Sequence, residues 1–194
     1  MKSLKNWLLV LSVLSCFGCS SPVHEDGRGC AFVSDSIQYR VEFMSEGCVR
    51  ILSFPEGDTL VTKRLVVDSQ KPAFKDYKWK DTGQQLIFST RELSVAFDKE
   101  DAAFTFQEVS TGKLLLKEKG AKKARHFKRS VTGGEQCLEV TQRFVPTDDE
   151  AIYGLGQYQN GIMNYRGKSV LLLQANMDIV NPFLISTNGY GILS

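Results

Sequence analysis

Short segments with strand-like alternation recur along this chain, and they restrict its possible folds more than any other feature. Residues 37–43 and 93–97 place apolar side chains at every second position, as strands with one buried face do. Further segments of strand composition cover residues 49–52, 60–67, 85–90, 103–107, 114–116, 137–144 and 169–174. Beyond the N-terminal segment, no long run keeps the helical period. We therefore expect an all-β fold, an antiparallel β-sandwich, with a closed barrel as the alternative that the pattern leaves open.

The composition fits one folded domain with a substantial core. Of the 194 residues, 42% are hydrophobic and 10% aromatic, which is more than disordered segments contain. A domain of this size buries about 70% of its unfolded surface and needs neither a disulfide nor a metal for stability. The net charge of +2, from 24 basic and 22 acidic residues, gives no reason to expect nucleic acid or another polyanion as a partner.

The N-terminus has the layout of an export signal. Residues 1–5 carry two lysines, and residues 7–17 are uncharged and largely apolar, with small residues after them. The apolar run is too short to cross a bilayer, which needs about 20 residues, and the three-part pattern is typical of a secretory signal. Because Cys19 stands at the expected cleavage point, the segment resembles a bacterial lipoprotein signal with Cys19 as the lipidated residue. Cys16 departs from that pattern, and an ordinary cleaved signal is the alternative.

These features predict how the chain is organised. We expect a signal peptide over residues 1–19, a flexible tether over residues 20–29 and a β-sandwich domain over residues 30–194. The protein would be exported and held by its lipid anchor on a membrane of the bacterial cell envelope, in the periplasm or at the outer membrane. Because the chain stops at Ser194 within what looks like a strand, we expect the domain to be incomplete at its C-terminus.

Three cysteines remain outside the signal, namely Cys30, Cys48 and Cys137. Their spacing does not suit a metal site. An exported protein could pair two of them and leave one odd. We prefer the interpretation that all three are buried, apolar cysteines.

Residues 117–129 form the most basic stretch of the chain. Such a stretch could bind anionic lipid headgroups or an acidic polysaccharide. The alternation of Arg125, Phe127 and Arg129 instead fits an edge strand, whose charges discourage pairing with another sheet. We prefer the edge-strand interpretation.

The sequence shows no self-contained active site. Its only histidines, His24 and His126, stand apart from any nucleophile, although hydrolysis by serine or cysteine needs a base beside the nucleophile. No ligand cluster indicates a metal and no glycine-rich fingerprint indicates a nucleotide, so we expect no cofactor. The densest acidic group, residues 148–150, is best explained as a solvated turn in which an aspartate caps a short helical turn.

The last fifty residues, by contrast, concentrate aromatic and amide side chains of the kind that recognise sugars. The tyrosines are Tyr153, Tyr158, Tyr165 and Tyr190. The amides are Gln157, Gln159, Asn160, Asn164, Gln174 and Asn176. Flat apolar faces combined with amide groups suit an uncharged polyhydroxylated ligand. The glycines among them allow tight turns or a close approach of the backbone to another group.

Five short motifs in this region carry a family resemblance. They are residues 150–157 (EAIYGLGQ), 164–167 (NYRG), 174–178 (QANMD), 181–183 (NPF) and 189–193 (GYGIL). In this order they resemble the N-terminal domain of family 31 glycoside hydrolases, the α-glucosidases and α-xylosidases, in an exported bacterial form. The resemblance covers most of residues 30–194. It implies a galactose-mutarotase-like β-sandwich packed against a (β/α)₈ barrel.

The resemblance also implies a mechanism. Family members act on α-linked oligosaccharides by retaining hydrolysis, with two carboxyl groups about 5–5.5 Å apart, and both aspartates lie in the barrel. We therefore expect no catalytic residue in this chain and no activity from the chain alone. The sandwich would supply a loop that hydrogen-bonds the sugar at the barrel mouth. Here that loop is residues 174–182, with Asn176 and Asp178 as the expected substrate-binding residues. A loop that caps its own backbone is the alternative.

Three functions follow as hypotheses. The first is the N-terminal, carbohydrate-binding-like domain of an exported retaining α-glycosidase, cut before its catalytic barrel, with the choice between α-xyloside and α-glucoside open. The second is a free-standing glycan-binding lipoprotein without hydrolase activity. The third is a structural or partner-binding sandwich with no role in sugar recognition. A severed domain should expose an apolar face, and the stop at Ser194 favours the first hypothesis.

Overall fold

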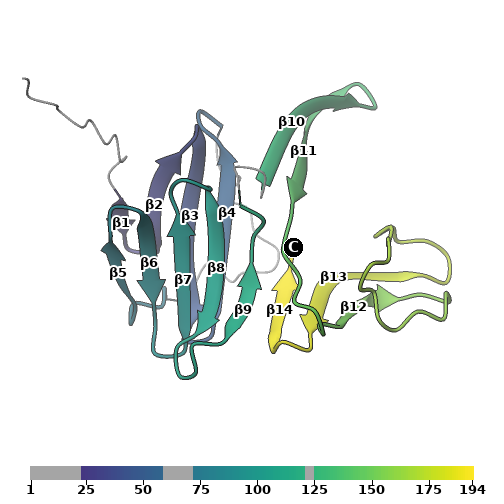
Figure 1. The fold of residues 1–194 in the computed structure, drawn as a ribbon. Helices are drawn as coiled ribbons and strands as arrows, with labels where there is room; N and C mark the ends of the chain where they lie inside the picture. The colour runs from purple at the N-terminus through teal and green to yellow at the C-terminus, as the bar shows by residue number, and fades with distance from the viewer. Residues whose placement is uncertain (1–22, 59–71, 121–124) are drawn as a thin grey trace, which may run out of the picture.

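The computed structural model describes residues 23–58, 72–120 and 125–194, which contain strands and loops but no helix (Figure 1). Two predictions lie outside these residues, the export signal with its lipidated Cys19 and the strand over residues 60–67. No helix in the described residues is long and apolar enough to cross a membrane.

Two antiparallel sheets face each other and form the sandwich (Figure 1). The first has the order β1-β2-β3-β4, and the second has the order β5-β6-β7-β8-β9. The strands of the first are β1 (His24–Asp26), β2 (Gly29–Ser34), β3 (Ile37–Ser45) and β4 (Cys48–Pro55). Those of the second are β5 (Lys78–Asp81), β6 (Gln85–Ser89), β7 (Leu93–Asp98), β8 (Ala103–Glu108) and β9 (Leu114–Lys117). Each sheet follows the chain order through hairpins, which confirms the predicted antiparallel sandwich.

Aromatic side chains fill the space between the two sheets. Along β7, Leu93, Val95 and Phe97 are buried while their neighbours are not, as the alternation predicts. The ring of Phe97 lies 4.8 Å from that of Phe32 in the opposite sheet and 4.9 Å from that of Phe104. Tilted rings at such distances add to the free energy gained from burying their area. The main hydrophobic cluster therefore lies between the two sheets formed by β1–β9.

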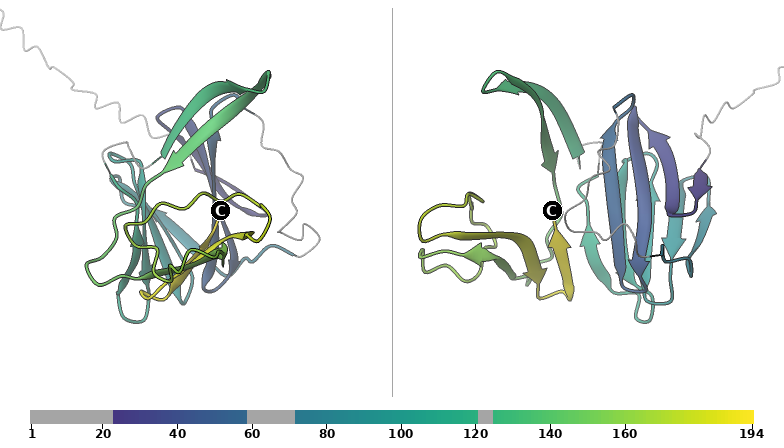
Figure 2. Two further views of the ribbon diagram at one scale, coloured as in Figure 1. Left: turned by 90° about the vertical axis from the view of Figure 1, so that its right-hand side faces the viewer. Right: turned by 180° about the vertical axis from the view of Figure 1, so that it is seen from behind.

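The remaining strands extend to one side of the sandwich (Figures 1 and 2). Strands β10 (Arg125–Thr132) and β11 (Glu135–Gln142) form a hairpin by themselves. Strands β12 (Ile152–Gln157), β13 (Ile179–Ser186) and β14 (Tyr190–Leu193) form an antiparallel sheet in that order. The prediction of an edge strand that contains Arg125, Phe127 and Arg129 is confirmed, since β10 pairs only with β11 among the described strands.

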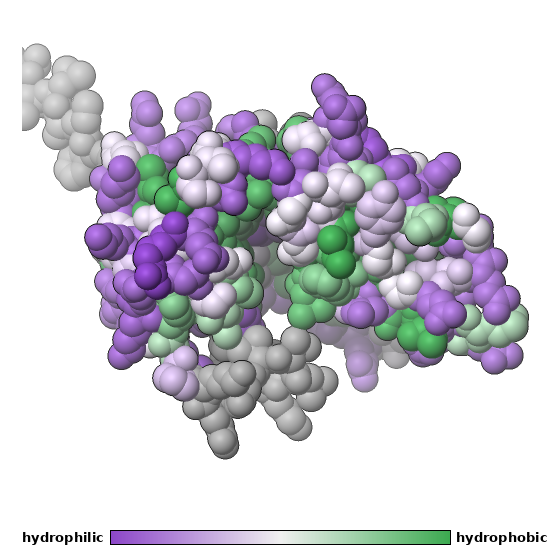
Figure 3. All heavy atoms as spheres, turned by 90° about the horizontal axis from the view of Figure 1, so that it is seen from below, coloured by the Kyte–Doolittle hydropathy of each residue, from purple (hydrophilic) through white to green (hydrophobic). Residues whose placement is uncertain are grey.

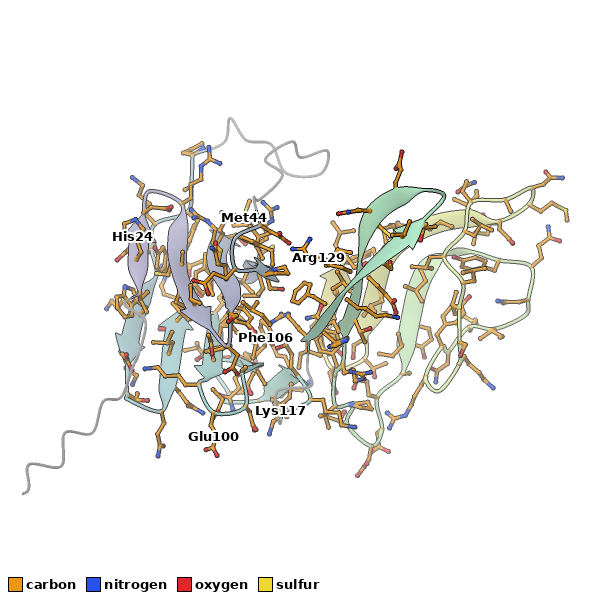
Figure 4. All side chains as sticks on the ribbon, turned by 90° about the horizontal axis from the view of Figure 1, so that it is seen from above. His24, Met44, Glu100, Phe106, Lys117 and Arg129 are labelled. Carbon is orange, nitrogen blue, oxygen red and sulfur yellow. The ribbon has the colours of Figure 1, made fainter. Side chains whose placement is uncertain are left out.

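Hydrogen bonds join the side strands to the sandwich. Beyond β9, the Lys119 amide donates to the Arg143 carbonyl, and the Val145 amide donates to the Lys117 carbonyl. Arg129 reaches from β10 toward the sandwich (Figure 4), where its Nη2 lies 2.7 Å from Asp58 Oδ1. The edge of the second sheet therefore continues into the segment between β11 and β12.

One buried ion pair, which the sequence analysis did not predict, lies where β10 begins. Arg125 Nη2 is 2.6 Å from Glu118 Oε1, and both side chains are buried. Glu118 also accepts hydrogen bonds from the Phe104 amide and from Gln142 Nε2. Because a buried carboxylate needs both a counter-charge and hydrogen-bond donors, these contacts fix the start of the hairpin against the sandwich.

The N-terminal edge is held more firmly than a tether would be. Within the segment predicted as a tether, His24–Asp26 form β1 and pair with β2. Glu25 accepts hydrogen bonds from the Tyr77 hydroxyl at 2.9 Å and from Trp79 Nε1 at 3.1 Å. The first sheet is thus tied to the segment around β5 at this edge.

Two predictions about local structure are wrong. Residues 169–174 form no strand, because the described chain offers their backbone no neighbouring strand, and Leu171 and Leu173 are exposed. Of the three cysteines, Cys30 is buried, but Cys48 and Cys137 are exposed, and none is in a disulfide. Cys48 begins β4 beside a tight turn, and Cys137 contacts the Ser130 hydroxyl on the hairpin surface. Both positions face solvent.

Candidate functional site

The C-terminal sheet is organised around Glu150, a residue that is only 3% exposed. Its Oε1 accepts hydrogen bonds from the Ser186 hydroxyl at 2.5 Å and from the Tyr190 hydroxyl. Its Oε2 accepts a hydrogen bond from the Thr147 amide at 3.0 Å. One carboxylate thereby ties the chain entering β12 to the end of β13 and the start of β14. The prediction of a solvated turn with a helical cap is wrong at Glu150. Its carboxylate is buried and accepts three hydrogen bonds.

The charge state of Glu150 follows from these contacts. Burial raises the pKa of its carboxyl, but the hydroxyls of Ser186 and Tyr190, the Thr147 amide and Arg166 lower it by more, so the net shift is downward. Burial and the adjacent carboxylate raise the pKa of the Tyr190 hydroxyl. At neutral pH the carboxylate is therefore ionised and the tyrosine keeps its proton. This arrangement makes Glu150 a structural anchor.

The motif at residues 164–167 is fixed on the same anchor. Arg166 Nη1 donates to the Glu150 carbonyl at 2.8 Å and to the Thr147 carbonyl. Asn164 Oδ1 accepts hydrogen bonds from the Ile152 and Arg166 amides. This motif therefore holds the long connection after β12 against the strand.

Two glycines of β12 allow the backbone of β13 to approach closely. Gly154 and Gly156 have φ values of +99° and +119°, and a bulge lies between them. A Cβ on Gly156 would lie 2.0 Å from the Ile179 carbonyl oxygen, and one on Gly154 would lie 2.6 Å from the Phe183 carbonyl oxygen. Only glycine combines these conformations with this spacing. The close backbone of β13, a strand of the same sheet, therefore requires glycine at both positions.

The loop predicted to bind substrate folds as a tight turn before β13. The Asp178 amide donates to the Ala175 carbonyl at 3.3 Å. Gln174 closes the turn from the side, because its Nε2 donates to the Asp178 carbonyl at 2.9 Å and its Oε1 accepts from the Val180 amide at 3.0 Å. Asn176 lies exposed at the tip, whereas Asp178 is half-buried at the base. The two predicted site residues therefore share one hydrogen-bonded turn and differ in exposure.

Many of the tyrosines and amides in this region serve the fold. Tyr165 is buried, and Tyr190 donates to the anchor carboxylate. The Tyr158 hydroxyl donates to the Leu155 carbonyl. Asn160, Asn164 and Gln174 all bond to nearby backbone groups. The exposed members of the predicted recognition set are Tyr153, Gln157, Gln159, Asn160, Asn164, Gln174 and Asn176.

The C-terminal sheet leaves apolar side chains exposed. On β13, Ile179, Phe183 and Ile185 alternate on one face with exposed fractions of 56%, 37% and 50%. The intervening Val180 and Leu184 are also apolar and only half-buried. Apolar residues likewise line both sides of the hollow between the sandwich and the C-terminal strands (Figure 3). A strand that is apolar on both faces is typical of a sheet covered on both sides, and exposed patches of this kind mark protein interaction surfaces.

The described residues contain no group of three or more His, Cys, Asp or Glu side chains that could hold a metal ion. Gln174 in the turn and Glu150 in the anchor use their polar atoms in hydrogen bonds within the fold. This geometry suits recognition of a neutral polar ligand at the tip of the turn.

Comparison with known proteins identifies the family to which this geometry belongs. Residues 38–194 match the glycosyl hydrolase 31 N-terminal galactose mutarotase-like domain. The chain is 31% identical over 173 residues to an alpha-xylosidase of Saccharolobus solfataricus, a match that covers 81% of this chain and 22% of that protein. The chain thus spans about a fifth of the length of this curated relative.

Solved structures give the same answer. The crystal structure of a GH31 alpha-xylosidase from Xanthomonas citri superposes with a TM-score of 0.74 at 29% identity, covering 87% of this chain and 18% of that one. A GH31 alpha-xylosidase from a soil metagenome, complexed with xylose, superposes with a TM-score of 0.67 at 25% identity, covering 88% and 27% respectively. These matches confirm the predicted galactose-mutarotase-like sandwich.

Proposed function

We propose that this chain, which belongs to the glycosyl hydrolase 31 family as its N-terminal galactose mutarotase-like domain, serves an exported retaining α-glycosidase. The observation that carries the proposal is the match to α-xylosidases over most of the chain but only about a fifth of the curated relative. Because the relatives described above are α-xylosidases, we favour α-xylosides as the substrates of the parent enzyme, with α-glucosides second.

In this proposal the two catalytic carboxyl groups lie in a separate barrel domain. Retaining hydrolysis needs them about 5–5.5 Å apart on either side of the glycosidic bond. This chain contributes recognition, with the turn at residues 174–178 reaching the mouth of that site. Asn176 at the exposed tip or Asp178 at the base hydrogen-bonds the sugar, and Gln174 keeps the turn in shape. A turn closed by its own hydrogen bonds needs less ordering on binding, which limits the conformational entropy lost.

The exposed apolar surface supports a covering domain. Strand β13 carries apolar side chains on both of its faces, and Phe183 and Ile185 lie on the more exposed face. Covering such a surface is favourable by roughly 25 cal/mol for each Å² removed from water. We propose that the catalytic domain of the parent enzyme covers this sheet, so that the turn at residues 174–178 is brought to the substrate.

Steady-state kinetics of the parent enzyme, as its own cells produce it, test this function. In the parent enzyme, Asn176→Ala and Asp178→Ala should be compared with Gln159→Ala, an exposed amide outside the turn. At least one turn variant should lose about tenfold in kcat/KM on an α-xyloside, the value of one hydrogen bond to substrate. If both turn variants match Gln159→Ala, the loop does not bind substrate. A gene product that binds oligosaccharide without hydrolysing it would instead indicate a free-standing glycan-binding lipoprotein.

The proposed location is the bacterial cell envelope, with a lipid on Cys19 as the membrane anchor. The support is the basic, apolar and small-residue pattern of residues 1–21. Fractionation of cells that make the native protein and Cys19→Ala tests it. The native protein should sediment with membranes, and Cys19→Ala should be released into the soluble exported fraction. Equal membrane association of both proteins would exclude the lipid anchor.

A further inference from the structure

The connection between β12 and β13, residues 158–178, presents an apolar surface to solvent. The described residues include four large apolar side chains that are at least 68% exposed. Three of these, Met163, Leu171 and Met177, lie in the connection, with exposed fractions of 79%, 78% and 68%, and Leu173 is also exposed. The loops of the connection project at the end of the C-terminal strands that lies farthest from the sandwich (Figures 1 and 2). The sandwich therefore does not cover this surface.

The surface belongs to a region that is nearly free of charge. Residues 151–194 contain three charged side chains, those of Arg166, Lys168 and Asp178, whereas the whole chain contains 24 basic and 22 acidic residues. Exposed apolar side chains in a contiguous patch mark interaction surfaces. Depletion of charged residues is the compositional mark of the centre of a protein–protein interface. The region is therefore suited to contact with another protein surface.

Leu171 and Leu173 lie between two points that the fold holds in place. On the N-terminal side, Tyr165 is buried and its amide donates a hydrogen bond to the backbone of β12 at 2.8 Å. On the C-terminal side, Gln174 closes the following turn through its two hydrogen bonds. The Leu173 amide also donates to the Leu171 carbonyl at 3.1 Å. A partner that binds the two leucines would therefore also fix the position of the turn that follows them.

We propose that Leu171 and Leu173 are positioning residues, which bind an apolar surface of the parent enzyme's catalytic domain and so place the turn at residues 174–178 against the substrate. This inference rests on the proposed function, in which the docking surface is the face of β13. The catalytic domain is the occupant because this chain spans only about a fifth of the curated relative. Met177 and Ile179 are exposed as well, so the apolar surface continues from the leucines to β13.

Substitutions in the parent enzyme test the role of Leu171. Leu171→Ser should lower kcat/KM on an α-xyloside about tenfold, the loss expected when the turn no longer reaches the sugar. The change should divide between KM and kcat as it does in the turn variant that loses activity, Asn176→Ala or Asp178→Ala. Leu171→Met keeps an apolar side chain of similar volume and should retain the native value. The matched control is Val131→Ser on the β10–β11 hairpin, where the valine is 70% exposed.

Two further measurements separate a positioning role from a purely structural one. In this chain alone Leu171 is exposed, so Leu171→Ser should leave the urea midpoint of unfolding unchanged. In the parent enzyme, Leu171→Ser should add less than about threefold to the loss caused by the turn variant, because both changes remove the same contact with the sugar.

The outcomes decide the proposal. A loss in Leu171→Ser that Leu171→Met and Val131→Ser do not show, and that is not additive with the turn variant, supports it. Native kinetics in both Leu171→Ser and Leu173→Ser overturn it, while a loss in Asn176→Ala or Asp178→Ala alone leaves the proposed function standing. An equal loss in Val131→Ser, full additivity with the turn variant, or a lowered urea midpoint in this chain also overturns it. A loss in Leu171→Ser without a loss in either turn variant overturns both proposals.

Discussion

Replacing Glu150 by alanine should loosen the C-terminal sheet while leaving the sandwich intact. The carboxylate accepts three hydrogen bonds, from Ser186, Tyr190 and the Thr147 amide. Hydrogen bonds to a charged acceptor contribute roughly 1.5–3 kcal/mol each. Water can reach part of the space left by the side chain and recover some of this free energy. We therefore expect a net loss of about 3 kcal/mol in the local stability of β12–β14.

Hydrogen exchange followed by mass spectrometry measures this loss strand by strand. A loss of about 3 kcal/mol corresponds to exchange that is faster by on the order of a hundredfold. The change should appear in peptides from β12, β13 and β14 and be absent from β6–β8. Glu139→Ala is the matched control, because Glu139 is exposed and its nitrogen–oxygen distance to Lys128 is 3.7 Å. Such surface pairs contribute little to stability.

The pH dependence of this stabilisation follows from the direction in which the pKa of Glu150 is shifted. The pKa of Glu150 in the folded protein lies below its ordinary value of 4.5. Its stabilisation is therefore fully present above pH 4.5 and is lost as the pH falls through the lower, folded value. The native protein should lose protection in β12–β14 over this acidic range, whereas Glu150→Ala should show no such dependence. Protection that differs less than twofold between native protein and variant at pH 7 would refute the assignment of Glu150 as the anchor.

Two further substitutions test packing elsewhere. Gly156→Ala should destabilise the chain by at least about 2 kcal/mol and Gly161→Ala by about 1 kcal/mol, because both have positive φ but only the first methyl group would meet a carbonyl oxygen, at 2.0 Å. Equal decreases in the thermal unfolding temperature of Gly156→Ala and Gly161→Ala would contradict this difference. Arg125→Met should cost roughly 3–5 kcal/mol, because it leaves Glu118 buried without a counter-charge, and adding Glu118→Leu should restore most of the loss. A urea midpoint for the double variant no higher than for the single one would contradict that explanation.

The sandwich could be predicted because its strands follow one simple rule. In β3, β6 and β7, alternate side chains enter the core, so the period of two is visible in the sequence. The β12–β14 sheet follows no such rule. β12 contains two glycines that serve backbone contact, and β13 is apolar on both faces. Apolar residues 170–173 have strand composition, yet no described strand pairs with them.

The candidate site was only partly predictable for a related reason. Its short motifs could be recognised as a pattern, and Asn176 is exposed on a turn as a binding residue needs to be. The role of Glu150 could not be read from its neighbours, because an acidic run normally faces solvent, and its donors Ser186 and Tyr190 lie far along the chain. The pairing of Glu118 with Arg125 was likewise hidden within a basic stretch. Contacts of this kind depend on tertiary structure, which local spacing does not encode.

The size of the native polypeptide tests the central claim most directly. An antibody raised against this domain should be used to blot extracts of the cells that produce it. We predict a band several-fold heavier than the 21.7 kDa of this chain, and α-xylosidase activity in the material that the antibody precipitates. A single band near 21.7 kDa without hydrolase activity would contradict the account, because the sandwich would then act without a catalytic domain.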